Sequence, residues 1–167
     1  MTTTLLITTY NWTDALEIVL MSVENQTIMP DEIIIADDGS TKETEDIIKK
    51  WQNKLKNPII HSWQEDIGFR AAASRNKAIV KSTGDYIIMI DGDLVLHPNF
   101  IKEHINHCKL NQFTIGTRVL LKEKYSKQLL AEKNITFPIN FNHILANSKN
   151  IINNSFFKCQ IKNAFFF

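Results

Sequence analysis

Two carboxylates with one glycine between them, Asp91 and Asp93, directly follow the apolar run of residues 87–90. Like charges about 4 Å apart repel by roughly 1 kcal/mol in water and about 4 kcal/mol at an effective dielectric constant of 20, so a partly buried pair favours a bound cation. Mg²⁺ and Mn²⁺ bind one or two carboxylates and keep coordination positions for water and phosphate oxygens. The pair therefore predicts a Mn²⁺ or Mg²⁺ site that could neutralise a departing diphosphate.

The Asp-Gly-Asp sequence is also compatible with two alternatives to a metal site of this kind. Asp and Gly are common turn residues, so the three residues could form a surface turn without any ligand. A haloacid dehalogenase-type phosphatase also places Asp-x-Asp after an apolar strand, with the first aspartate as the nucleophile. An EF-hand calcium loop is excluded, because Val95 and Lys102 stand where that loop requires oxygen ligands.

A second acidic group, residues 37–40, follows the isoleucine-rich run of residues 32–36. Asp38 could accept a hydrogen bond from the imide of a nucleotide base, and Gly39 would let the backbone approach a ligand closely. The alternative is a loop that starts a helix and whose carboxylates interact with the helix dipole.

Two arginines, Arg70 and Arg75, lie in the small-residue segment of residues 68–76. On a helix without bulky neighbours their guanidinium groups could reach phosphate oxygens. Either arginine could instead lie on a solvated helix face. Beside a carboxylate-metal site, phosphate binding by at least one of them is the favoured interpretation.

The elements that must position these groups alternate along the chain. Short apolar runs predict strands over 5–8, 32–36, 59–63 and 86–90, and a further strand over 113–121. Helical spacing predicts helices over 16–23, from Ser40 in a capping box to residue 55, over 69–81, and from Pro98 in the first turn to residue 108. This alternation predicts an α/β fold with a mostly parallel, Rossmann-like sheet flanked by helices and a ligand site beyond the carboxyl ends of the strands.

Composition narrows the class of protein. The 167 residues carry 19 Lys and Arg against 18 Asp and Glu, so the formal charge of +1 does not favour nucleic acid as a partner. Residues 1–7 lack the features of a signal peptide, and no apolar stretch reaches the roughly 18 residues of a membrane span. Cys108 and Cys159 show no metal-ligand spacing and are expected to be reduced. We therefore expect a cytoplasmic protein, with peripheral association with the inner face of the membrane left open.

Four segments together carry a resemblance to a known family: Thr8-Thr9-Tyr10-Asn11, residues 36–40, residues 68–76 and residues 90–93. In order and spacing they resemble the first half of family 2 glycosyltransferases, from about residue 5 to residue 121. The resemblance implies a GT-A fold that binds a nucleoside diphosphate sugar, with a UDP-sugar expected, through a divalent metal. It also implies sugar transfer with inversion to a saccharide or lipid-linked acceptor, and residues 64–69 are similar to relatives in cell-surface polysaccharide synthesis.

The resemblance assigns nucleotide-binding roles residue by residue. It places Thr8 and Tyr10 around the nucleoside and Asp38 on the base. Arg70 would approach the nucleotide, and Arg75 is carried over with less support.

The resemblance also assigns the metal site but no catalytic base. Asp93 matches the metal ligand of the family, and Asp91 would support the ribose or bind the metal through water. Family members deprotonate the acceptor with an Asp or Glu, commonly in a Glu-Asp pair, and no such pair occurs after Leu121. Glu123 and Glu132 lie in no matching motif, so the base is unknown. Loss of such a base commonly costs on the order of 10²–10⁴ in rate.

Two regions and three hypotheses follow. Residues 1–121 would form the nucleotide-sugar-binding domain, and residues 122–167 a partial acceptor-side region or truncated tail. Residues 154–158 look like the start of that region, and the sequence stops at residues 165–167, Phe-Phe-Phe. The leading hypothesis is a glycosyltransferase; the alternatives are a truncated remnant that binds nucleotide sugars without turnover and the metal-dependent phosphatase.

Overall fold

The computed structural model describes residues 1–135 and 157–160. Helices and strands alternate along the described chain, as the sequence predicts. In order, the elements are β1 (Thr3–Thr9), α1 (Thr13–Glu24), β2 (Glu32–Asp37), α2 (Lys42–Lys54), β3 (Ile59–Trp63), α3 (Ala71–Lys81), β4 (Tyr86–Asp91), β5 (Leu94–Leu96), α4 (Phe100–His107), β6 (Thr117–Leu120), α5 (Glu123–Glu132) and β7 (Phe157–Gln160).

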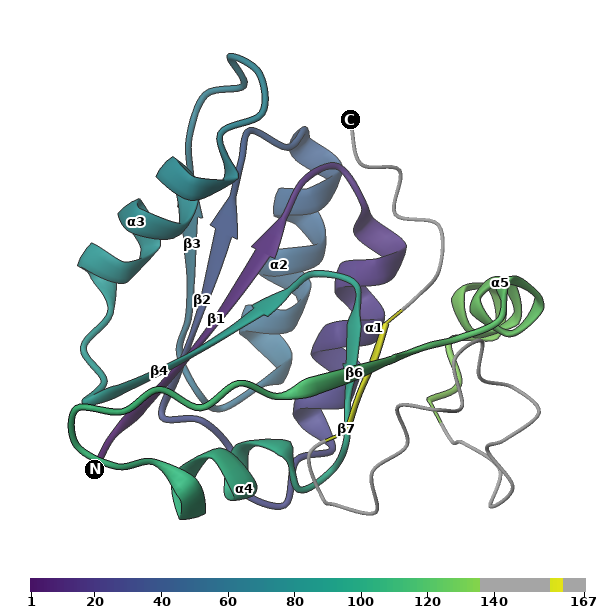
Figure 1. Ribbon diagram of the computed structural model, residues 1–167. Coiled ribbons are helices and arrows are strands. Elements are labelled where there is room, and N and C mark those ends of the chain that lie inside the picture. The colour runs from purple at the N-terminus through teal and green to yellow at the C-terminus, as the bar shows by residue number, and fades with distance from the viewer. Residues whose placement is uncertain (136–156, 161–167) are drawn as a thin grey trace. The chain divides into compact units, whose positions relative to one another are not determined.

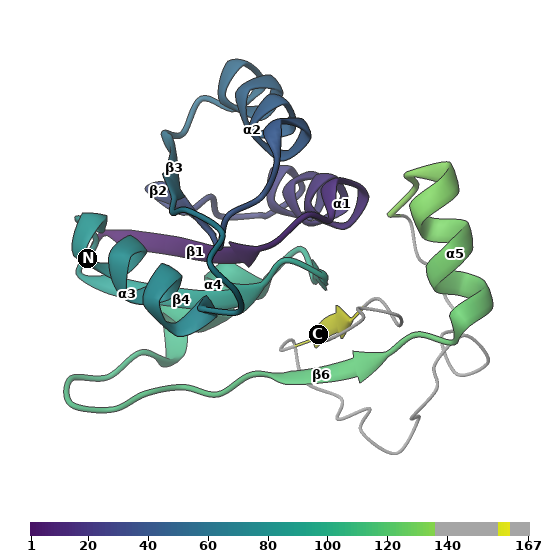
Figure 2. The ribbon, with the colours of Figure 1, turned by 90° about the horizontal axis from the view of Figure 1, so that it is seen from above.

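The first four strands form one parallel sheet in the order β3-β2-β1-β4. Leu6 at the centre of β1 pairs with Ile34 on β2 and with Met89 on β4. The helix α2 and the beginning of α1 cover one face of the sheet, and α3 covers the other (Figures 1 and 2). A central strand that is covered on both faces carries hydrophobic residues on both, which is why consecutive apolar residues occur in the middle of β1 (Leu-Leu-Ile) and of β2 (Ile-Ile-Ile-Ala). The predicted α/β fold and its four parallel strands are confirmed.

Small residues let α3 pack closely against the sheet. Ala78 of α3 lies in a buried cluster with Leu6, Ile34 and Ala36 of the two central strands. On the other helix layer Trp51 of α2 is buried, and the ammonium group of Lys54 lies 4.3 Å from the centre of its ring. These contacts fix the helices that carry or adjoin the site.

By its internal contacts the described chain divides into two compact units. Unit 1 comprises residues 1–17 and 29–92, and unit 2 comprises residues 18–28 with the described residues from Asp93 onward. Unit 2 has its own sheet, in which β7 pairs antiparallel with β5 and parallel with β6. The boundary expected at residue 121 separates a nucleotide-sugar-binding domain from an acceptor-side region. The division by internal contacts does not test it, so it stays a prediction.

Several element boundaries differ from the prediction. Thr41, not Ser40, precedes α2 and its side chain makes no capping hydrogen bond, so the predicted capping box is wrong. Pro98 lies before α4, which begins after Asn99, and β6 covers only part of the strand predicted over 113–121. The helix α5 was not predicted, because its sequence is largely polar. Residues 154–156 and 165–167 lie outside the described residues.

None of the helices in the described part of the chain has the length and apolar character that spanning a lipid bilayer requires.

Candidate functional site

The carboxyl ends of the four parallel strands bring most of the predicted site residues to one edge of the sheet. Strand register aligns Thr8 at the end of β1 with Ala36 on β2 and with Asp91 on β4. The strand β3 adds Trp63, which pairs with Asp37. The loops that follow the strands therefore begin side by side, in the position where open α/β sheets bind ligands.

An ion pair between Arg75 and Asp91 lies at this edge, with Thr8 beside it. Nη2 of Arg75 donates a hydrogen bond to Oδ1 of Asp91 at 2.9 Å and lies 3.5 Å from Oγ1 of Thr8. The Thr8 hydroxyl is itself 3.3 Å from Oδ1 of Asp91. Because 40% of the arginine side chain and 44% of the aspartate side chain are exposed, the pair contributes little to stability and stays accessible to a ligand.

Gly92 lets the chain pass tightly against β1 directly after this pair. A Cβ atom at residue 92 would overlap the carbonyl oxygen of Thr8, so only glycine fits. Asp93 comes next, and its side chain is buried where β5 begins. The division between the units falls between Gly92 and Asp93, so the two aspartates of the Asp-Gly-Asp sequence belong to different units.

Asp38 is nearly buried and anchors the loop between β3 and α3. Its Oδ2 accepts a hydrogen bond from the backbone N–H of Arg70 at 2.7 Å, and its Oδ1 accepts one from the side-chain amide of Gln64. Only 6% of Asp38 is exposed. Sequence reasoning missed this anchoring role and the part played by Gln64; the predicted contact of Asp38 with a base stays a prediction.

Tyr10 and Gly39 hold the same loop against the ends of β1 and β2. The Tyr10 hydroxyl donates a hydrogen bond to Oδ2 of Asp66 at 2.8 Å, and this bond to a carboxylate raises the pKa of Tyr10 above its ordinary value. Gly39 has a φ of 101°, and a Cβ there would lie 2.6 Å from Cα of Asp66. Glycine is therefore required both by the backbone conformation and by the close approach of the loop.

Asn11 joins the loop after β1 to the loop after β2. Its backbone N–H donates to Oγ of Ser40 at 2.9 Å, and its Oδ1 accepts the backbone N–H of Thr41 at 2.8 Å. The φ of Asn11 is 44°, a left-handed conformation that asparagine tolerates better than most residues. The Ser40 hydroxyl thus serves a neighbouring loop, which is the physical reason that it does not cap α2.

Asp37 fixes β2 to β3 immediately before the site. Its Oδ1 accepts the backbone N–H of Ser40 at 2.8 Å, and its Oδ2 lies 2.8 Å from Nε2 of His61. Burial opposes ionisation, but the hydrogen bonds from His61 and Ser40 outweigh it and lower the pKa of Asp37. Nothing in the sequence indicated His61, because the contact depends on strand register.

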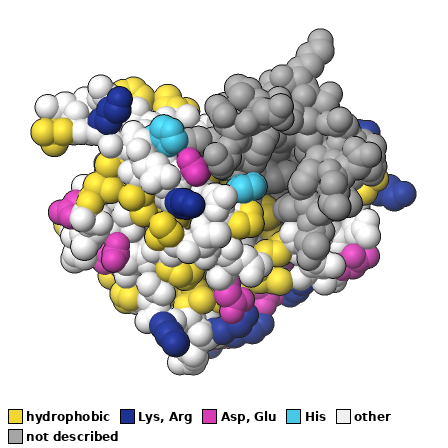
Figure 3. Space-filling view, turned by 90° about the horizontal axis from the view of Figure 1, so that it is seen from below, with side chains coloured by type: hydrophobic (Ala, Val, Ile, Leu, Met, Phe, Trp, Pro, Cys, Tyr) yellow, Lys and Arg dark blue, Asp and Glu magenta, His cyan; other side chains and the backbone are white. Residues whose placement is uncertain are grey.

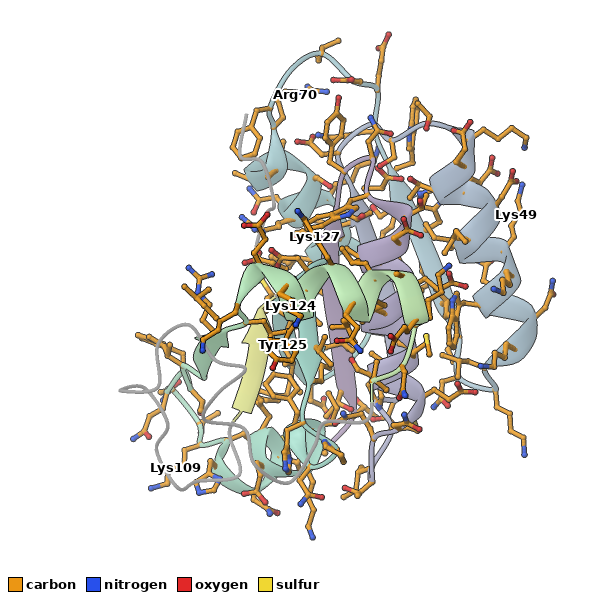
Figure 4. The ribbon with its side chains drawn as sticks, turned by 90° about the vertical axis from the view of Figure 1, so that its right-hand side faces the viewer. Lys49, Arg70, Lys109, Lys124, Tyr125 and Lys127 are labelled. Carbon is orange, nitrogen blue, oxygen red and sulfur yellow. The ribbon has the colours of Figure 1, made fainter. Side chains whose placement is uncertain are left out.

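The two predicted arginines have different surroundings. Arg70 stands immediately before α3 (Figure 4), and its Nη2 donates to the carbonyl oxygen of Glu65 at 2.9 Å, which closes the loop on itself. Arg75 lies one turn into the helix and pairs with Asp91. The phosphate contact predicted for each arginine stays a prediction.

These features define an α/β protein in which the carboxyl edge of the parallel sheet carries charged side chains and two glycines, Gly39 and Gly92, at points where the chain packs too closely for a Cβ atom. A family model described as glycosyl transferase family 2 matches residues 4–162. The chain belongs to this family, and the match favours the glycosyltransferase hypothesis over the phosphatase alternative.

Three known proteins illustrate what the chain is similar to. It is 34% identical over 102 residues to hyaluronan synthase of Pasteurella multocida, with 60% of this chain and 10% of the relative covered. It is 30% identical over 98 residues to validoxylamine A glucosyltransferase of Streptomyces hygroscopicus subsp. limoneus, with 58% and 21% covered. It is similar to glucosyl-3-phosphoglycerate synthase of Mycobacterium tuberculosis in a complex with Mn²⁺ and UDP, with a TM-score of 0.53, 19% identity, and 79% of this chain and 50% of that chain covered. This structural similarity supports the GT-A fold, while the chain spans at most about a fifth of the length of the two relatives.

Proposed function

We propose that this chain forms the donor-binding part of an inverting glycosyltransferase that transfers a sugar from a UDP-sugar to a saccharide or lipid-linked acceptor. The observation that carries the proposal is the Arg75–Asp91 pair with Thr8 beside it, at the carboxyl edge of the sheet. An exposed guanidinium there can bind a diphosphate, and a carboxylate next to a threonine hydroxyl can accept hydrogen bonds from a ribose. A place in cell-surface polysaccharide synthesis and a cytoplasmic location belong to the same proposal.

The nucleoside would lie by the loops that Asp38 and Tyr10 hold together. The half-exposed ring of Tyr10 offers an aromatic face to a base. Both oxygens of Asp38 already accept one hydrogen bond, yet a carboxylate has about four acceptor positions, so one more bond from a base imide fits its chemistry. Arg70 would act near the nucleotide from the start of α3.

The carboxylates of the Asp-Gly-Asp sequence fit a Mn²⁺ or Mg²⁺ ion by the chemistry of their oxygen atoms. No group of three or more His, Cys, Asp or Glu side chains that could enclose a metal ion occurs among the described residues. An ion bound by Asp93, and by Asp91 directly or through water, would keep positions for phosphate oxygens and water, as Mg²⁺ commonly does. When bound, such an ion would neutralise the negative charge of the leaving diphosphate.

Calorimetric titration of the purified chain with UDP, with and without Mn²⁺, tests the proposal. We expect binding only in the presence of Mn²⁺, and at least a roughly 100-fold loss of affinity in Asp93→Ala, because the ion and its phosphate contacts are lost together. Asp85→Ala is the matched control, since Asp85 precedes the same strand as Asp91 but lies at the opposite edge. This control should bind UDP as the unchanged chain does.

The proposal fails if UDP binds equally well without a divalent ion, or if folded Asp93→Ala keeps full affinity. Because Asp93 is buried, its variant is first compared with the unchanged chain by circular dichroism. Hydrolysis of a phosphomonoester that is lost in Asp91→Ala would favour the phosphatase instead. Binding without sugar transfer would favour the nucleotide-sugar-binding remnant.

A further inference from the structure

Three large apolar side chains in the loop between α4 and β6 face solvent. Leu110, Phe113 and Ile115 are 91%, 85% and 78% exposed. The loop leaves α4 at Cys108 and extends before it enters β6 (Figure 2). Apolar side chains scattered singly on a surface need no explanation, but three within six residues mark an interaction surface.

The loop has a defined local structure that holds these side chains outward. The backbone N–H of Gln112 donates to the carbonyl oxygen of Lys109 at 3.1 Å, and Asn111 has a φ of 60°. This is the pattern of a β-turn with a left-handed third residue, a position that asparagine favours, and it places Leu110 at the tip.

In the residues that follow the turn, the large apolar side chains are exposed and the small residues are partly buried. This is the reverse of a strand that packs on a protein core, where the large apolar side chains face inward. Phe113 and Ile115 are exposed, whereas the small residues Thr114 and Gly116 between and after them are partly buried. Because residues two apart project from the same side of an extended chain, Phe113 and Ile115 form one apolar face that points outward.

The surroundings of this loop are basic. From α4 to β6, residues 102–118 contain three lysines or arginines and one glutamate, an excess of two positive charges in a chain whose formal net charge is +1. Lys102 on α4 and Lys109 in the loop itself (Figure 4) are both exposed. The face seen from below carries hydrophobic side chains beside lysine or arginine side chains, with Asp and Glu side chains also present (Figure 3).

We propose that the loop of residues 109–116 docks on an anionic lipid bilayer. Leu110, Phe113 and Ile115 would enter the boundary between headgroups and acyl chains, and the surrounding lysines would bind the anionic headgroups. Exposed apolar side chains beside basic residues are the combination that binds such interfaces, with an affinity that depends on both buried apolar area and anionic lipid. The proposal rests on unit 2 alone and does not require the donor site to function.

Co-sedimentation of the full chain with lipid vesicles tests this inference. One set of vesicles is phosphatidylcholine alone, and the other contains roughly three parts phosphatidylcholine to one part phosphatidylglycerol. We expect binding to the anionic vesicles, weaker binding to phosphatidylcholine, and at least a roughly tenfold loss of partitioning in the triple variant Leu110→Ser, Phe113→Ser and Ile115→Ser. Val80→Ser is the matched control, because Val80 on α3 is 86% exposed but lies outside the loop.

A charge variant and a nucleotide titration complete the test. Lys102→Glu with Lys109→Glu should weaken binding to anionic vesicles and leave the little binding to phosphatidylcholine unchanged. The triple variant should keep the UDP affinity of the unchanged chain, so a failure of the donor site and a failure of membrane docking are distinguishable. Equal sedimentation of the triple variant and the unchanged chain would overturn the inference. It would also be overturned by light scattering that shows self-association abolished by the triple variant, because the occupant would then be a second copy of the chain.

Discussion

The two edges of the parallel sheet use carboxylates differently. At the amino edge three acidic side chains accept hydrogen bonds from backbone N–H groups: Asp31 from Thr3, Glu32 from residues 83 and 84, and Asp85 from Thr2. Hydrogen bonds to the ionised form lower the pKa of all three groups, although burial opposes this effect at Glu32. These carboxylates hold the N-terminal ends of β1, β2 and β4 together.

At the carboxyl edge the carboxylates join loops that come from different strands. Asp38 and Asp66 hold the β3–α3 loop, and Asp91 pairs with an exposed arginine. The comparison teaches that the same residue type stabilises the fold at one edge, whereas at the other edge it lies where the donor site is proposed. The difference can be measured as an effect on stability or on nucleotide affinity.

The largest expected effect on stability is at the amino edge. Glu32→Ala removes the acceptor for the backbone N–H groups of residues 83 and 84 and for the Thr4 hydroxyl, so the free energy of unfolding should fall by about 3 kcal/mol. Urea unfolding measures this loss. Glu32→Gln keeps a carbonyl acceptor and should lose less. The UDP affinity of the folded protein should not change in either variant. A large change would contradict the proposal that carboxylates at the amino edge stabilise the fold and do not take part in ligand binding.

Two glycines of the carboxyl edge, Gly39 and Gly68, separate the cost of a left-handed backbone conformation from the cost of close packing. Gly39→Ala should destabilise by about 2 kcal/mol, because it adds both left-handed strain and a clash with Asp66. Gly68→Ala should cost only about 1 kcal/mol, since Gly68 has a φ of 92° but open space around its Cβ position. Thermal unfolding of the two variants checks this order. Equal losses would mean that the loop moves freely away from Gly39.

Arg75 should affect ligand binding far more than stability. Arg75→Ala should weaken UDP binding about tenfold, equivalent to roughly 1.4 kcal/mol. The free energy of unfolding should change by less than about 0.5 kcal/mol, because the ion pair with Asp91 is partly exposed. Calorimetry and urea unfolding give the two values, with Lys81→Ala at the end of the same helix as control. A loss of stability without a loss of UDP affinity would mean that Arg75 stabilises the fold and does not bind the nucleotide.

The smallest expected effect is on stability near neutral pH, and it follows from the lowered pKa values of four carboxylates. For Asp31, Glu32, Asp37 and Asp85 the folded state binds protons less readily than the unfolded chain, so their stabilisation is fully present above the unfolded pKa of about 4. It is lost as the pH falls through the lower folded values. The urea midpoint should thus change little from pH 7 to about 5.5 and fall below about pH 4. A midpoint independent of pH in the acid range would contradict this, and Glu32→Gln should flatten the decline.

The sequence predicted the strands and the edge of the site, but not the contacts within that edge. An isoleucine-rich run such as residues 32–36 identifies a strand because a parallel strand that is covered on both faces needs hydrophobic residues on both. The sequence indicates Asp38 by its chemistry and its position after a strand, and Arg75 by its chemistry on a helix of small residues. The bonds from Gln64 to Asp38 and from Tyr10 to Asp66 join residues 26 and 56 positions apart, so no local pattern indicates them. The misplaced start of α2 has the same origin, since Ser40 is bound by the distant Asn11.

The helix α1 limits how this protein can be divided for expression. Its residues after Glu17 belong to unit 2, where the Ser22 hydroxyl accepts the backbone N–H of Leu96 and Gln26 accepts that of Ile101. A recombinant fragment that ended at Gly92 would contain the whole four-stranded sheet, yet it would lack these partners for the second half of α1. Its buried Val19 and Val23 would then lose the packing that unit 2 provides, which favours aggregation. Production of the donor site alone therefore requires redesign of α1 rather than a single cut in the chain.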